Sequence, residues 1–154
     1  FLITIREPIQ HANSMLNQHF HFCKLQKEND FIRRYMNYLG HKEFGLNHIS
    51  WNKSLDYKDL NNINYWIEQW CLFYQNIFDK YKSNNKCIFV IYEELTNPYY
   101  IEKLLNKISL NKEKNLNLNF FKNSNKDVLN IVYSKNLKKC ANDIYDAFKA
   151  RSNF

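Results

Sequence analysis

The sequence predicts an α/β fold in which a parallel sheet is flanked by helices, with more helix than strand. Residues 1–5 and 87–92 are short apolar runs rich in β-branched residues, a composition typical of buried parallel strands. Segments with helical periodicity lie between them, and parallel strands need such crossover connections. Of the 154 residues, 45% are hydrophobic, so we expect one core and a single domain over 1–154.

The first strand leads directly into a helix. Arg6 ends the apolar run, and Pro8 suits the first helical position because it has no N–H group to leave unpaired. Glu7 complements the positive end of the helix dipole. Ile9, Ala12 and Leu16 follow at helical spacing, so we expect a strand, a turn and a helix in the first quarter of the chain.

Two more helices are expected before the second strand. Asp30 is expected to cap a helix that ends at Gly40, where a left-handed backbone is often needed. From about Asp56 to Tyr81, apolar residues recur every three or four positions, which predicts a long amphipathic helix. Its many aromatic residues indicate core packing.

Two helices are also expected after the second strand. Asn97 and Pro98 have the composition of a helix start, and Ser134 is expected to cap a last helix that continues to Phe148. The polar residues 109–119 between them predict a surface loop.

Charge and hydropathy restrict the class of protein. A net charge of +7 and a pI of about 9.2 suit anionic partners such as nucleotides or nucleic acid, although the lysines are scattered. No apolar stretch approaches the ~20 residues of a membrane span, so we expect a soluble, cytoplasmic protein. The chain starts at Phe1 within a strand, without an initiator Met, and we therefore expect it to be part of a longer protein.

Cysteine and histidine spacing does not predict a metal site. His19 and His21 are two residues apart and would point to different sides of a helix. The cysteines form no CxxC pair, which favours reduced, packed thiols over a zinc or redox motif. They are Cys23, Cys71, Cys87 and Cys140.

Arg6 and Ser14 are the residues best placed to bind an anion. In open parallel sheets, ligands bind beyond the carboxyl ends of the strands, where a helix N-terminus also offers N–H groups. The planar guanidinium of Arg6 can bind two phosphate oxygens, and Ser14 lies about two turns into the helix. The spacing alone leaves open that Arg6 is only a salt-bridge partner.

Both residues belong to a longer pattern, which is Phe1-Leu2-Ile3-Thr4-Ile5-Arg6-Glu7-Pro8 followed by Ser14-Met15-Leu16. This pattern resembles the 3′-phosphate-binding motif of the sulfotransferases that use 3′-phosphoadenosine 5′-phosphosulfate (PAPS). In that family a strand ends in Arg-Asx-Pro or Arg-Glu-Pro, and a Ser eight residues after the Arg joins it on the 3′-phosphate. The resemblance implies that Arg6 and Ser14 bind this phosphate in PAPS and in the product 3′,5′-bisphosphoadenosine (PAP).

A second pattern follows the long helix in the order that the same family shows. It is Val90-Ile91-Tyr92-Glu93-Glu94-Leu95, then Asn97-Pro98. It is similar to the strand and Tyr-Glu-Asp-Leu turn of the family, which implies that Tyr92 lies near the adenine. The alternative is that Tyr92 only closes the strand end with its hydroxyl bonded nearby. Glu93 and Glu94 are expected to hold the turn.

The resemblance covers roughly residues 1–108 and implies a P-loop-NTPase-like sulfotransferase fold, of which this chain is the C-terminal portion. The family's 5′-phosphosulfate loop and usual catalytic base precede the 3′-phosphate strand, so we expect the isolated segment to be inactive. A late Arg-Lys-Gly loop of the family has no counterpart here. The candidate substitutes are Lys122, Asn123, Ser124 and Lys126.

The implied activity is transfer of a sulfuryl group from PAPS to a hydroxyl or amine of an unidentified acceptor, without a metal. In the loop from Gly40 to Gly45, His41 is a candidate for the acceptor side, with Glu43 and His48 nearby. Two alternatives remain open: a basic helical module that binds nucleic acid, and an inactive scaffold with the same fold. Oligomeric state does not follow from the sequence.

Overall fold

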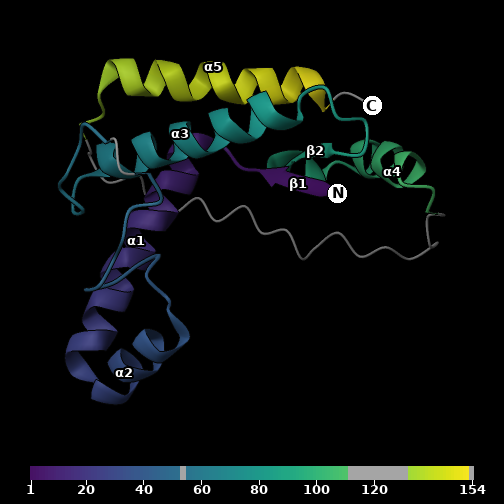
Figure 1. Cartoon of the computed structure of the whole chain (residues 1–154). Coiled ribbons are helices and arrows are strands. Elements are labelled where there is room, and N and C mark those ends of the chain that lie inside the picture. Colours follow the sequence, from purple (N-terminus) through teal and green to yellow (C-terminus); the bar gives the residue numbers. More distant parts are fainter. Residues whose placement is uncertain (53–54, 111–131, 153–154) are drawn as a thin grey trace.

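The computed structural model describes residues 1–52, 55–110 and 132–152. This part of the chain is α/β and rich in helix, as predicted (Figure 1). Its elements are β1 (Leu2–Ile5), α1 (Pro8–Glu28), α2 (Asp30–Leu39), α3 (Ile63–Tyr81), β2 (Ile88–Ile91), the 3₁₀ helix η1 (Tyr92–Thr96), α4 (Pro98–Lys107) and α5 (Lys135–Arg151).

The two described strands pair in parallel, as the helical crossover between them predicted. Their register runs from Leu2 opposite Ile88 to Ile5 opposite Ile91. The carboxyl ends of both strands therefore lie side by side at one edge of the sheet. The residues that follow them, at the starts of α1 and η1, leave the sheet at the same place.

The strands differ in how deeply they are buried. Phe89, Val90 and Ile91 of β2 are buried, whereas in β1 only Ile5 is buried and Leu2 is exposed. The expectation that the first strand is buried on both faces is therefore wrong for the described residues. Its apolar composition identifies a strand, but it does not determine how many layers of structure cover that strand.

The core forms where α5 runs along α3 beside the sheet (Figure 1). Phe148 of α5 is fully buried, and its ring centroid lies 5.9, 5.0 and 4.9 Å from those of Tyr74, Phe78 and Phe89. All three contacts are edge-to-face, a geometry that aromatic pairs prefer. This cluster joins α5 to both α3 and β2, and Trp66 and Trp70 of α3 are buried as predicted for core residues.

The caps of three helices show which boundaries the sequence predicted correctly. Asn97 accepts a hydrogen bond from Tyr99 N–H at the start of α4, and the Ser134 hydroxyl accepts one from Leu137 N–H at the start of α5. For α2, however, the cap is Asn29 and not Asp30. The Asn29 side-chain oxygen accepts the N–H groups of the second and third residues of α2, and Asp30 is the first helical residue.

The long helix starts at Ile63, seven residues later than expected from the apolar pattern. The N–H groups of Asp56 and Tyr57 donate to the two carboxylate oxygens of buried Glu68, at 2.9 and 3.0 Å. Because the Glu68 carboxylate binds these two N–H groups, the backbone at residues 56 and 57 folds back on α3 and does not form an extra turn of that helix. Asn62 then caps the helix through the Asn64 N–H.

The glycine-bearing loop after α2 folds back onto α1. Gly40 ends α2 with a φ of 71°, which is the left-handed conformation predicted there. Further along, Gly45 N–H donates to Nδ1 of His19, and Leu46 N–H donates to Oε1 of Gln26 at 2.7 Å. Two buried polar side chains of α1 therefore hold this loop in place.

Replacing Gly45 with alanine should lower the free energy of unfolding by about 2–3 kcal/mol. Its φ is +91°, and a Cβ atom would lie 2.3 Å from Gln26 Oε1, the oxygen that accepts the Leu46 N–H. Gly40→Ala is the matched control, because its φ is +71° but nothing lies within 4 Å of its Cβ position. Gly40→Ala should lower the free energy of unfolding by only about 1 kcal/mol. Urea unfolding measures both variants. Equal decreases in the free energy of unfolding for Gly45→Ala and Gly40→Ala would contradict the close contact between Gly45 and Gln26.

Candidate functional site

Arg6 and Tyr92, which belong to the two separate sequence patterns, meet at the carboxyl edge of the sheet. Cζ of Arg6 lies 5.7 Å from the centroid of the Tyr92 ring, within the ~6 Å range of cation–π contacts. The cause is the strand register, because Ile5 pairs with Ile91 and the next residue of each strand follows directly. A planar cation and an aromatic ring therefore lie together where ligands bind in parallel sheets.

The guanidinium of Arg6 carries a donor that is not used within the described part of the chain. Its Nε is buried and has no hydrogen-bond partner there. None of the ion pairs among the described residues involves Arg6. An unpaired buried donor costs about 1–3 kcal/mol, and a bound anion would satisfy it. Among the described residues Arg6 is therefore not a salt-bridge partner, and its role on a phosphate stays a prediction.

Glu93 holds the structure around this edge. One of its carboxylate oxygens accepts the Glu7 N–H at 2.9 Å, and the other accepts the Tyr145 hydroxyl proton at 2.7 Å. It therefore connects η1 to the start of α1 and to α5. As predicted, Glu93 holds the turn, and its two oxygens are occupied by donors other than Arg6.

The N-terminus of α1 is already capped by a side chain. Glu7 accepts the Gln10 N–H with its carboxylate, at 2.6 Å. Pro8 has no N–H, and the Glu7 carboxylate occupies the Gln10 N–H, which is one of the groups expected to face an anion.

Ser14 lies on α1 with its side chain exposed. Positions 7, 11 and 14 share one face of a helix, so Ser14 follows His11 along the face that starts at Glu7. Among the described residues, the Ser14 hydroxyl forms no hydrogen bond, and no contact joins it to Arg6. Its role on a phosphate stays a prediction.

His11 is a site residue that the sequence did not single out. Burial, and secondarily the charge of Arg6, lower the pKa of His11 to about 4, although the charge of Glu93 acts in the opposite direction. Its Nδ1 is buried without a hydrogen-bond partner among the described residues. His11 is therefore neutral at pH 7, and Arg6 supplies the positive charge at this place. The helical spacing from Glu7 was the signal that could have identified it.

Acidification should destabilise the fold through His11. Between the ordinary pKa of 6.5 and the folded value of about 4, the unfolded chain binds a proton at His11 that the folded chain does not. Neutral His11 therefore contributes to the free energy of unfolding above pH 6.5, and this contribution is lost as the pH falls. The free energy of unfolding should decrease by about 2 kcal/mol between pH 7.5 and pH 5. The check is urea unfolding at both pH values, in which His11→Leu should lose this part of the pH dependence.

His21→Ala is the control for this experiment, because His21 is exposed on the same helix. It should keep the full pH dependence of the wild-type protein. If His11→Leu also kept the full pH dependence, the assignment of a neutral, half-buried His11 would be wrong.

A small apolar pocket of about 240 Å³ adjoins His11. Trp70 is one of its lining residues, and the Nε1 of Trp70 is buried without a partner among the described residues. The pocket includes Trp51 but not Trp66, whose indole N–H donates to the Leu60 carbonyl inside the core. It can accommodate a small apolar or aromatic group. Its lining residues are His11, Met15, Trp51, Trp70, Phe73 and Tyr74.

The structure does not bring His41 together with Arg6. His41 is exposed just after α2, with Nδ1 3.4 Å from a carboxylate oxygen of Glu43. Figure 1 shows α2 at the end of α1 that lies away from the sheet. His48 is hydrogen-bonded to the Glu43 carbonyl and to the Tyr65 hydroxyl, both at 2.6 Å, which gives it a structural role.

The substitutes proposed for the late basic loop, Lys122, Asn123, Ser124 and Lys126, lie outside the described residues, as does most of the loop predicted over 109–119. In the described ranges, no group of three or more His, Cys, Asp or Glu side chains can hold a metal ion. No helix in those ranges combines the length and apolar character needed to cross a bilayer.

Comparison of the chain with models of protein families, with curated proteins and with solved structures finds no match.

Proposed function

We propose that this chain forms the 3′-phosphate and adenine side of the PAPS site in a sulfotransferase. The observation that carries the proposal is the buried Nε of Arg6, which has no partner in the described structure and lies beside Tyr92 at the carboxyl edge of a parallel sheet. Two sequence patterns that are far apart in the chain predicted these two residues, and the fold brings them into contact.

The chemistry of the side chains suits a phosphorylated nucleotide. A guanidinium binds phosphate through short, charge-assisted hydrogen bonds, and it can stack on a ring at the same time. Tyr92 offers that ring, and its other face or edge can contact the adenine. Ser14 adds a hydroxyl donor from the exposed face of α1.

In this proposal the described residues bind and orient the nucleotide. Arg6 neutralises the 3′-phosphate, and Glu93 fixes the start of α1 against η1, which keeps Arg6 and Tyr92 together. Holding the sulfuryl donor in one orientation lowers the activation barrier of the transfer, because the entropy cost of orienting it is met by binding. The bound cofactor supplies the sulfuryl group that passes to a hydroxyl or amine. No described residue is assigned the role of the catalytic base.

Thermal unfolding of the full-length protein with and without PAP tests the proposal. At a PAP concentration of 100 times Kd the fold gains about 2.7 kcal/mol, which raises Tm by roughly 5–10 °C. If the chain is instead a nucleic-acid-binding module, PAP should have no effect, and an oligonucleotide should bind with a steep dependence on salt. If neither ligand changes Tm, the inactive scaffold is favoured and the proposal fails.

A further inference from the structure

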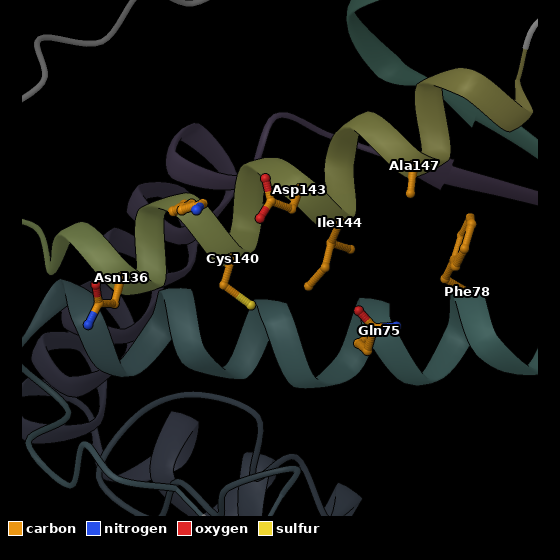
Figure 2. A pocket seen from close by; sticks show the side chains of 8 residues that line it. Gln75, Phe78, Asn136, Cys140, Asp143, Ile144 and Ala147 are labelled. Carbon is orange, nitrogen blue, oxygen red and sulfur yellow. The ribbon is translucent and has the colours of Figure 1, made fainter.

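Cys71 of α3 and Cys140 of α5 lie next to each other, although they are far apart in the sequence. The two helices pack directly against each other. Sγ of Cys71 also lies 4.0 Å from the carbonyl oxygen of Leu137, one helical turn before Cys140. Figure 2 shows the side chain of Cys140 pointing from α5 toward α3. The packing of these two helices therefore forms a cysteine pair that the sequence spacing did not predict.

The two thiols differ in access to solvent. Cys71 is buried, and burial together with the neighbouring Cys140 raises the pKa of the Cys71 thiol. Cys140 is exposed, which corrects the expectation that all four thiols are packed. It lines a groove of about 410 Å³ between the two helices, together with Gln75 and Phe78 of α3 and Asp143 of α5 (Figure 2). A small oxidant can therefore reach Cys140 directly, whereas Cys71 is covered.

We propose that Cys71 and Cys140 are an oxidation site, at which a peroxide converts the two thiols to a disulfide that links α3 to α5. The sulfur of Cys140 attacks one oxygen of hydrogen peroxide, the O–O bond breaks, and water leaves, so that Cys140 becomes a sulfenic acid. The sulfur of Cys71 then attacks the sulfur of Cys140. The S–S bond forms, the S–O bond breaks, and the hydroxide leaves with the Cys71 proton as a second water. Two thiols lose two electrons and two protons, and the peroxide is reduced to two waters.

The link would restrain the helix that supports the candidate nucleotide site. Tyr145, which follows Cys140 on α5, donates to Glu93, and Glu93 accepts the Glu7 N–H beside Arg6. A disulfide that closes the long segment between residues 71 and 140 restricts the unfolded chain, so oxidation should raise Tm by roughly 5–10 °C. This inference does not depend on the identity of the nucleotide.

The test is to oxidise the reduced protein with hydrogen peroxide, alkylate the remaining thiols in denaturant, and digest with trypsin without reduction. The Lys and Arg positions place Cys71 in the peptide 59–80 and Cys140 in the peptide 140–149. We expect mass spectrometry to find these two peptides linked and two of the four cysteines alkylated. Dithiothreitol should separate them again.

Variants separate this site from general oxidation. Cys140→Ser should abolish the linked peptide and the rise in Tm, and Cys87→Ser should leave both unchanged, because the half-buried Cys87 lies just before β2. The wild-type digest decides the question even if a variant does not fold. Cys140 found as sulfinic acid or in a link between two chains, with Cys71 alkylated, would overturn the proposal.

Discussion

Replacing Arg6 with alanine is expected to abolish most of the thermal protection that PAP gives to the full-length protein. The guanidinium lies beside Tyr92, where we place the adenine side of the nucleotide. A charge-assisted hydrogen bond contributes about 1.5–3 kcal/mol, so the affinity for PAP should fall roughly 10- to 100-fold. The measurement is Tm across a titration with PAP, for the wild type and the variant.

Two further variants make this result specific. Arg6→Lys keeps the charge but not the planar, two-donor geometry, so it should retain only part of the protection. Arg33→Ala removes an exposed arginine that pairs with Asp30, and it should leave the protection unchanged. Without ligand, Arg6→Ala should unfold at nearly the wild-type Tm, because it also removes the unpaired buried Nε. Full protection of Arg6→Ala by PAP would show that the nucleotide binds elsewhere.

Phe148→Ala should lower the free energy of unfolding by about 3–5 kcal/mol. Phe148 is fully buried, and its ring contacts those of Tyr74, Phe78 and Phe89 edge-to-face. Its removal leaves a cavity between α5, α3 and β2, and the aromatic contacts are lost as well. Urea unfolding at pH 7.5 measures the effect.

The control for the core is Phe31→Ala. Phe31 is 70% exposed on α2, where its ring stacks on Tyr35, so its loss should lower the free energy of unfolding by less than about 1 kcal/mol. If Phe148→Ala cost no more than this control, α5 would not be packed on the sheet as described. The support that Tyr145 gives to Glu93 would then also be wrong.

Local patterns predicted most of the helices and strands. The apolar runs identified β1 and β2, and Gly40 and Ser134 identified the end of α2 and the start of α5 because these signals act within one turn. The start of α3 was wrong, since the apolar spacing continues upstream of Ile63. The helix starts there because Asn62 caps it and because Glu68 binds the backbone of residues 56 and 57, a tertiary contact that the apolar spacing does not show.

The candidate site was predictable where it depends on strand order, and not where it depends on packing. Parallel strands bring their carboxyl ends together, so Arg6 and Tyr92 could be placed at one edge from the sequence. The half-buried position of His11 depends on how α1 packs against its neighbours, whereas the cap that Glu7 provides lies within one turn of α1. The contact between Cys71 and Cys140 likewise requires the packing of α5 on α3, which no spacing along the chain reveals.

The most direct test of the site is to compare the affinities of PAP and adenosine 5′-phosphate for the full-length protein by titration calorimetry. The two ligands differ only in the 3′-phosphate, which is the group that we assign to Arg6. The proposed site predicts that PAP binds at least ~10-fold more tightly, since one charge-assisted contact exceeds the 1.4 kcal/mol that a factor of ten requires. Equal affinities for the two nucleotides, or no binding of either, would contradict it.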